Sequence, residues 1–582
     1  MTLLLVVSGC RVGVHSPASG AGATSGNLGL TGVRAPSETA GGTLRLVAGP
    51  IASLDPTRSY QYGSWNFMRL YTRQLVTFAP RPGPAGAGVV PDLAASLGRV
   101  SNGGRSWTYT LRTGIRFENG QPITAVDVKY GIERAFAAGT LAGGPSWLVQ
   151  LLDNPKDPFP GPYQDKDLHK GGLAAITTPD ARTVVFRLTK PFADFDRVLA
   201  LPDASPVPAA LDTGKDYGAK PVSSGPYRFA GPYHPTITTT TTGTASHGTV
   251  VLVRNTQWDR RTDLVRTALP DRIELVVGLT PTERDARLRD GGADLDITGS
   301  GLQPDSVAST LRDRDLAART DNPINSSLRM LALPATVAPM RNPHCRYAVQ
   351  YAVDKAAIKD GLGGDYGATL ATSLWPRTLP GYPASAPFPS GEGNHGDLAR
   401  ARGELAACGH PGGFSTRIAT VGSGRSLRIA QEVSTALARV GIEAEVRPFP
   451  EEVFLTSGAG APKAIADGGY GIVVVSWSAD FPSLAAFLPP LLDSRNTASL
   501  GNTNYAQLSD LGLARLADSA AGEVDPVVAG ELWRRVNAVA MQRAGYVPLV
   551  EDKVVLLTSA RVRNAYVQVV WGNHDLVSVG VA

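Results

Sequence analysis

Polar and apolar residues alternate in some segments of the chain and follow a helical spacing in others. Alternation over 106–114 and 183–188 predicts half-buried strands, and the apolar-rich stretch 43–48 predicts the first strand of the folded body. Apolar residues three and four apart predict a helix over 66–76 and another over 124–136, with Thr124 as the N-cap of the second.

The second half of the chain has the pattern of a βαβ unit. A strand over 416–421, an amphipathic helix over 426–440 and a strand over 442–446 follow one another, which predicts a mainly parallel sheet. The Thr-rich stretch 236–247 is a low-complexity polar segment between two predicted strands, and we interpret it as a mobile loop.

The stretch 469–488, GYGIVVVSWSADFPSLAAFL, places a carboxylate at the end of an apolar strand. Ile472 to Val475 have the β-branched content of a buried strand, and Pro482 opens an apolar helical segment. Ligands of open α/β sheets bind outside the carboxyl ends of strands, so Asp480 is a candidate for pairing with a cation. The alternative is that Asp480 only caps the following helix. This stretch alone favours neither.

Composition narrows the class of protein. A chain of 582 residues accommodates two or three domains, and a net charge of +5 without a basic block argues against nucleic-acid binding. Beyond the first residues no apolar stretch is long enough to span a bilayer. The motifs HExxH, GxSxG and CxxC are absent, so an enzyme would need a nucleophile and base assembled from distant segments; we expect neither an enzyme nor a bound metal or cofactor.

The N-terminus and the cysteines indicate export. VSGC, ending at Cys10, resembles the lipobox at which bacterial lipoproteins are cleaved and lipidated, and the Gly/Ser/Ala-rich stretch 11–41 suits a flexible tether. The alternative is a chance cysteine after small residues. In an oxidising compartment Cys345 and Cys408 can form a disulfide; the alternative is two buried free thiols.

A series of motifs resembles one family in its order along the chain, from about Gly42 to the C-terminus. The family is the solute-binding proteins of ABC importers for dipeptides, oligopeptides and nickel. The motifs are LDP at 54–56, PDLAAS at 91–96, SWTYTLRTGIRFENGQPITAVDVKYGIER from 106, SSGPYRF at 223–229, VLVRNTQWD at 251–259, LRDGGADLDI at 288–297 and RYAVQYAVDKAAI at 346–358.

The resemblance implies an α/β, type II periplasmic-binding-protein-like fold with two lobes, a hinge and an extra domain inserted in the first lobe. The expected division is 1–41 signal remnant, lipobox and tether; 42–62 first lobe; 63–205 inserted domain; 206–322 first lobe; 323–548 second lobe; and 549–582 the return to the first lobe. The segments 321–331 and 546–557 are the expected crossings between the lobes.

In peptide binders of this family, an Asp shortly after a Trp in a W-x-A-D motif pairs with the ligand's α-amino group. Trp477, Ser478 and Asp480 match this motif, and the resemblance makes Asp480 the anchor and Trp477 a wall of the site. Some members carry an Arg three residues before the Trp, where Val474 stands here, so contact with the far end of the ligand is open.

The sequence therefore predicts a monomeric extracytoplasmic lipoprotein that captures peptides and delivers them to an ABC permease. Two alternatives stay open. One is the same fold with another solute, such as a nickel chelate or a sugar, and the other is a surface receptor or chaperone that senses peptides.

Overall fold

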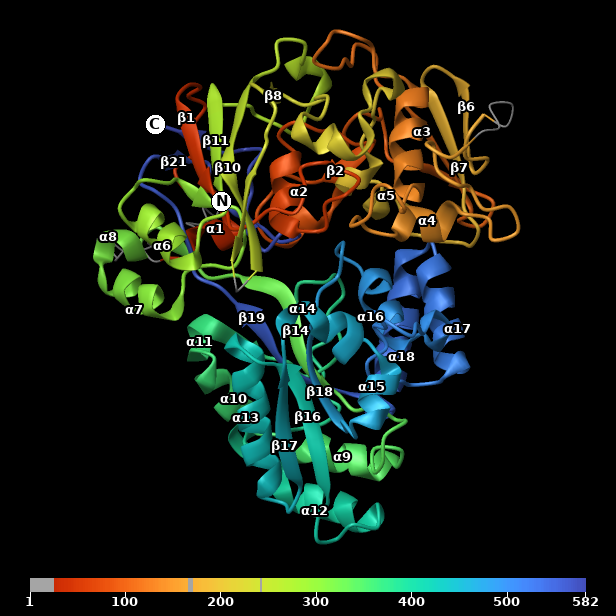
Figure 1. Cartoon of the computed structure of the whole chain (residues 1–582), viewed down its shortest axis with the longest axis vertical. Helices are drawn as coiled ribbons and strands as arrows, with labels where there is room; N and C mark the ends of the chain where they lie inside the picture. Colours follow the sequence, from red (N-terminus) through yellow and green to blue (C-terminus); the bar gives the residue numbers. More distant parts are fainter. Residues whose placement is uncertain (1–25, 166–170, 241–242) are drawn as a thin grey trace, which may run out of the picture.

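The structure is a computed structural model that describes residues 26–165, 171–240 and 243–582. Figure 1 shows two lobes, each built on its own β-sheet, with a third, smaller sheet beside the sheet of the first lobe. In the part of the chain that is described, no helix combines the length and apolarity needed to cross a bilayer. The two-lobed α/β architecture is the one that the sequence motifs predict.

The sheet of the first lobe mixes parallel and antiparallel strands. The strand β1 runs parallel to both of its neighbours, and the remaining pairs are antiparallel. Across the sheet the order is β12 (Leu295–Asp296), β1 (Thr43–Val47), β11 (Arg272–Val277), β10 (Gly243–Arg254) and β8 (Tyr227–Phe229). Beside it in Figure 1 lie α6 (Pro281–Arg289), α7 (Pro304–Arg312) and α8 (Arg314–Ala317).

The inserted domain is built on a four-stranded antiparallel sheet. Its order is β4 (Arg99–Ser101), β5 (Ser106–Thr110), β7 (Thr183–Arg187) and β6 (Ile176–Asp180). The helix α3 (Ala125–Glu133) begins as predicted at Thr124, which forms a capping box with Asp127. The short helices α4 (Trp147–Leu152) and α5 (Phe195–Val198) lie at the end that faces the second lobe (Figure 1).

The second lobe contains a six-stranded sheet with helices on both faces. The strand order is β15 (Ala368–Leu370), β19 (Tyr546–Lys553), β14 (Ile324–Ala332), β18 (Ile472–Trp477), β16 (Ser415–Val421) and β17 (Glu443–Phe449). The helices are α9 (Pro343–Ala352), α10 (Lys355–Gly361), α11 (Gly364–Gly367), α12 (Leu398–Ala407), α13 (Gly424–Ala438), α14 (Glu451–Val453), α15 (Pro462–Asp467), α16 (Leu484–Leu492), α17 (Leu511–Gly522) and α18 (Pro526–Gln542). Leu328 and Met330 of β14 face one core and Leu331 faces the other, as period-two alternation requires.

The two lobes are joined by paired strands at the predicted crossings. β14 and β19 run antiparallel from Ala332 opposite Tyr546 to Ile324 opposite Lys553. Above them, β13 (Thr320–Asp321) pairs with β20 (Leu556–Leu557), and the chain then ends in the first lobe with the pairs β21 (Val562–Arg563) with β24 (Gly580–Val581) and β22 (Val567–Gln568) with β23 (Asn573–His574). Two predicted boundaries fall inside elements, because β19 continues across 548/549 and α2 (Tyr62–Met68) across 62/63.

Three predictions about local structure are wrong. The helix over 66–76 is limited to α2, because the carbonyls of Leu70 and Tyr71 accept amides of Tyr227 and Gly225 instead of continuing the helix; β2 (Val76–Phe78) then pairs with β3 (Val89–Pro91). The sheet of the second lobe is parallel only at β18–β16–β17, because the interlobe strands are antiparallel. The described part of the Thr-rich stretch forms strands rather than a loop: β9 (Thr236–Thr240) pairs antiparallel with β10, as β-branched residues favour.

The end of the predicted tether also differs from the expectation. The helix α1 (Leu28–Thr31) packs on the first lobe, where the Gly29 amide donates to Asp321 at 2.8 Å and Arg34 pairs with the same carboxylate at 2.9 Å. Residues 26–41 therefore belong to the folded body rather than to a tether. The predicted lipobox and Cys10 lie outside the described residues.

A disulfide joins α9 to the end of α12. Cys345 and Cys408 are 63 residues apart in the sequence, with Cα atoms 5.4 Å apart. Cys345 is fully buried and Cys408 nearly so. The disulfide links two helices of the second lobe, so it stabilises that lobe and does not connect it to the first.

We expect the denatured, unreduced protein without its Cys10 segment to show no reactive thiol and to gain two after reduction. The double variant Cys345→Ala/Cys408→Ala should lose about 4 kcal/mol of stability in the second lobe, as loop-closure entropy predicts for a loop of this length. Thiol labelling and chemical denaturation are the measurements. Two reactive thiols before reduction would show that the cysteines are free.

Candidate functional site

The strand β18 carries Asp480 to the junction of the two lobes. Ile472 to Val475 are at most 2% exposed, whereas Ser476 is exposed and Trp477 is half-buried. The chain then turns into α16, whose N-cap is Ser483: its hydroxyl accepts the Ala485 amide at 3.0 Å. Asp480 is therefore not the cap of this helix, and the capping alternative is wrong.

Asp480 is held by side chains from the other lobe. The Tyr60 hydroxyl lies 2.8 Å from Oδ1 and 2.9 Å from Oδ2, and the Trp147 indole N–H donates to Oδ2 at 2.6 Å. The Tyr62 hydroxyl donates to the neighbouring Ala479 carbonyl at 2.7 Å. Segments about 420 and 330 residues away in sequence thus meet at the carboxylate that the W-x-A-D motif singles out.

Aromatic packing supports this contact between the lobes. The Trp147 ring lies 5.1 Å from Phe481 and 6.0 Å from Phe192, measured between centroids, and Tyr60 packs edge-on against Trp65 at 5.5 Å. Close by, the Ser483 hydroxyl donates to Asp194 of the inserted domain, and the Ala193 amide donates to the Ala521 carbonyl at 2.8 Å. The lobes are therefore in contact, with α16 and α17 against the inserted domain (Figure 1).

The other two predicted site residues, Trp477 and Ser478, make contacts within the protein. The Trp477 indole donates to the Phe487 carbonyl at 3.1 Å, and Trp477 is opposite Leu328 in the sheet. Ser478 is half-buried and lies beside the Tyr62 hydroxyl. Both residues thus shape the loop that presents Asp480.

The charge of Asp480 is not compensated by any described side chain. Its partners are neutral donors, and no described Lys, Arg or His pairs with it. Burial raises the pKa of the carboxyl, and the hydrogen bonds from Trp147 and Tyr60 offset only part of this rise. A half-buried carboxylate with no counter-charge is chemically suited to pairing with a cation.

Sequence reasoning missed the first-lobe half of the site. Tyr60 and Tyr62 follow the LDP motif within SLDPTRSYQY, and Trp147 opens the short helix α4. In the sequence, the only signal was a Tyr beside a turn, and it does not indicate which residue that Tyr contacts. Only the fold shows that these donors converge on Asp480.

A cavity of about 620 Å³ lies beside the hinge, on the same face of the sheet as Trp477. Thr369, Glu551, Leu328 and Trp477 form a row across four strands, which leads from this cavity toward Asp480. Both lobes line the cavity, including Leu30 and Val569 from the first and Arg377, whose Nε lies 3.0 Å from Glu551, from the second. Its size therefore depends on how the lobes are placed.

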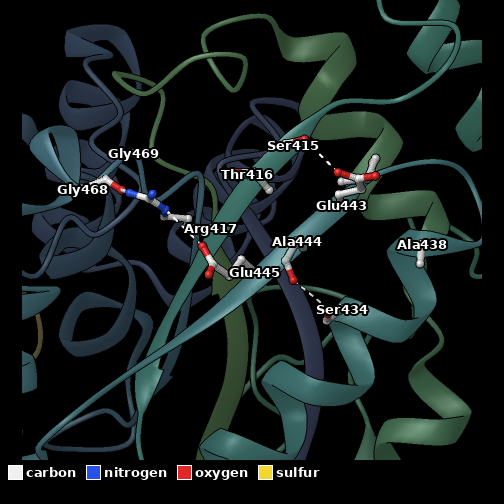
Figure 2. A pocket seen from close by; sticks show the side chains of 11 residues that line it. Ser415, Thr416, Arg417, Ser434, Ala438, Glu443, Ala444, Glu445, Gly468 and Gly469 are labelled. Carbon is white, nitrogen blue, oxygen red and sulfur yellow. Dashed lines mark hydrogen bonds and ion pairs between the residues drawn. The ribbon is translucent and has the colours of Figure 1, made fainter.

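A second hollow lies at the opposite end of the same sheet. Figure 2 shows its lining at the starts of β16 and β17, far along the strands from Asp480. Most of its polar groups are paired: Arg417 with Glu445 at 3.4 Å and with the Gly468 carbonyl at 2.9 Å, and Ser434 with the Ala444 carbonyl at 2.7 Å. In the described residues no group of three or more His, Cys, Asp or Glu could hold a metal.

Two lobes on a paired-strand hinge, with an uncompensated carboxylate where they meet, define a solute-binding protein that closes over its ligand. A family model described as bacterial extracellular solute-binding proteins, family 5 Middle, matches residues 88–499. The chain belongs to this family, as the ordered motifs predict. Such proteins serve ABC importers by binding a solute outside the cytoplasm, and they are not enzymes.

Known proteins resemble this chain over most of its length. The structure of clavulanic acid biosynthesis oligopeptide binding protein 2 is 42% identical, with a TM-score of 0.91 over 96% of this chain and 99% of that one. DppA from Helicobacter pylori, in complex with the peptide STSA, has a TM-score of 0.68 at 20% identity over 94% and 99%. The glutathione-binding protein GsiB of Escherichia coli O1:K1 is 25% identical over 78% of this chain and 79% of its own.

The assignment of the cap to Ser483 leads to a test. Ser483→Ala should lower the free energy of unfolding by about 0.5–2 kcal/mol, because the helix loses its N-cap and the lobes lose a contact. Asp480→Ala should cost the ligand-free protein less, since it removes a buried charge along with two hydrogen bonds. Chemical denaturation compares them, and an unchanged stability of Ser483→Ala would contradict the capping role of Ser483.

Proposed function

We propose that this protein captures peptides outside the cytoplasm and delivers them to an ABC permease, and that Asp480 pairs with the α-ammonium group of the peptide. The observation that carries the proposal is the uncompensated charge of Asp480 at the junction of the lobes. The ammonium group of a peptide in a closed cleft also needs a partner of opposite charge, because burying an unpaired ion costs several kcal/mol. Pairing the ammonium group with Asp480 therefore compensates both charges.

The relatives support a ligand of this class. The structure with 42% identity is named as an oligopeptide-binding protein, and GsiB is named as binding glutathione, itself a small peptide with a free α-ammonium group. Asp480 does lie against protein partners, which would suit another solute, but Tyr60 and Trp147 are neutral and leave the charge for a ligand. A sugar would bring no cation to this carboxylate.

Anchoring is the second part of the proposal. Cys10 carries the lipid, and the tether runs from it to the folded body, which begins by residue 26. The first described residues lie against Asp321, next to the hinge. A protein held in this way stays close to a permease in the membrane.

The ligand contact is tested with peptides in pairs. Asp480→Asn keeps the size of the side chain and removes its charge, so we expect binding of a free peptide to weaken by about 2–5 kcal/mol. An N-acetylated peptide should bind the wild type poorly, and the substitution should cost it much less. Calorimetric titration of both proteins with both peptides is the measurement.

Ser478→Ala serves as a control in the same loop, because its contact with Tyr62 is not charged. Equal losses for free and acetylated peptides would contradict pairing with the α-ammonium group. Failure of the wild type to bind any peptide would shift the assignment to another solute, whereas peptide binding without a nearby permease gene would favour a sensing receptor.

The anchor is tested separately. Full-length protein with Cys10→Ser, expressed from its native start, should leave the membrane fraction and appear in the soluble extracytoplasmic fraction. Cys345→Ser is the control, since it removes a cysteine that lies in a folded helix and is bonded to Cys408. Retention of the Cys10→Ser protein at the membrane with wild-type abundance would refute the lipid anchor.

A further inference from the structure

The cavity beside the hinge contains a positive charge without a carboxylate partner. Arg377 and Lys553 are its charged lining residues, and no acidic side chain is among the described residues that line it. Arg377 is compensated, because the two carboxylate oxygens of Glu551 accept its backbone amide at 2.6 Å and its Nε at 3.0 Å. The remaining charge of the cavity is therefore that of Lys553.

The side chain of Lys553 is half-buried and forms no ion pair with a described carboxylate. Its Nζ donates to the Asp365 carbonyl at 2.7 Å, which leaves two of the three ammonium donors for other partners. The Asp365 carboxylate itself pairs with Lys359 at 2.5 Å. Burial lowers the pKa of Lys553, as expected for an ammonium group without a direct counter-charge. A carboxylate that enters the cavity would supply this counter-charge.

The sheet places Lys553 and Asp480 at the same edge. β18 and β19 both pair antiparallel with β14, so they run in the same direction with β14 between them (Figure 1). Glu551 and Trp477 are both opposite Leu328. Lys553 lies two residues beyond Glu551, and Asp480 lies three residues beyond Trp477. Two strand spacings amount to about 10 Å, which an extended peptide of about three or more residues covers.

The rest of the cavity is suited to an apolar side chain. Both lobes contribute to it, so a ligand that fills it contacts both and favours the closed form. Its apolar lining residues include Leu30, Ala87, Val567 and Val569 from the first lobe, Ile324 from the hinge and Leu379 from the second lobe.

Val474 does not supply a contact for the far end of a ligand. It stands where some members of the family carry an Arg, but it is 1% exposed and packs in the core on the other face of the sheet. A positive charge for the far end has to come from another strand, and β19 provides one in Lys553.

We propose that this cavity is the subsite for the C-terminal residue of the peptide, with the α-carboxylate on Lys553 and the side chain against the apolar lining. This inference rests on the proposed peptide binding and specifies the far end of the ligand. The site then has a negative charge at Asp480 and a positive charge at Lys553, as the two ends of a zwitterionic peptide require. The preferred ligands are oligopeptides with a free carboxyl terminus and an apolar last residue.

Acid and amide forms of the same peptides test this contact. Alanine peptides of three to five residues that end in Leu are used, each as the free acid and as the C-terminal amide, which have nearly the same shape. We expect the wild type to prefer the acid by about tenfold or more at one or more of these lengths. Lys553→Met should lose this preference while binding the amides as before. Calorimetric titration gives the affinities, and thermal unfolding verifies that each variant is folded.

Lys463→Met is the matched control and should keep the preference, because Lys463 lies outside the cavity and pairs with Asp467 at 2.5 Å. Two results overturn the inference even if peptides bind. One is equal affinity of the wild type for acid and amide at every length, and the other is an equal loss for both forms in Lys553→Met. Neither result touches the pairing of Asp480, which N-acetylation tests separately.

A ligand without an α-ammonium group supplies an independent readout. N-acetyl-leucine at millimolar concentration presents the carboxylate and the apolar side chain alone, and N-acetyl-leucinamide is its neutral counterpart. In methyl NMR spectra the acid should shift the signals of Ile324 and Val567 severalfold more than the amide does, in the wild type but not in Lys553→Met. If no peptide binds, the proposed function fails, and this titration decides the cavity: unchanged signals reject the subsite, and shifts that depend on Lys553 support it.

Discussion

The paired strands β14 and β19 are the constraint on which the rest of the structure depends. The two strands run from the six-stranded sheet of the second lobe to the edge of the first lobe, with register shifts between Ile324 and Leu328 and between Arg329 and Met330, and β13 and β20 pair beyond them. Backbone hydrogen bonds hold the two connections together, so the lobes can change their angle but cannot slide apart. The position of every interlobe contact, including those of Asp480, follows from this hinge.

The contacts between the lobes around Asp480 are made by neutral hydrogen-bond donors rather than by charged side chains. Tyr60, Tyr62 and Trp147 supply hydroxyl and indole N–H groups, and Trp147 adds ring packing against Phe481. Neutral hydrogen bonds contribute about 1 kcal/mol each, so they allow the lobes to meet without fixing them there. An Arg in place of Tyr60 or Trp147 would compensate the charge of Asp480 and leave less for a ligand to neutralise.

The sequence predicts helices and strands better than it predicts which distant segments they contact. Local patterns identify β1, β5, α3 and the β16–α13–β17 unit, because the alternation of buried positions and the Thr124 cap are local properties. They fail at 66–76, where amides from 225 and 227 end the helix, since no local signal announces a distant hydrogen-bond partner. The motif resemblance identifies Asp480, but Tyr60 and Trp147 come from two other segments and are brought to it only by the fold.

The distribution of buried carboxylates links stability to function. Asp92 with Arg73 and Arg266, and Asp55 with Arg134, show that this fold places an Arg beside most of its buried aspartates. Removing such a partner typically costs about 3–5 kcal/mol, so leaving Asp480 without one lowers the stability of the empty closed form. A ligand that supplies the missing charge recovers this free energy on closing. Ligand affinity and the preference for the open empty state therefore arise from the same uncompensated charge.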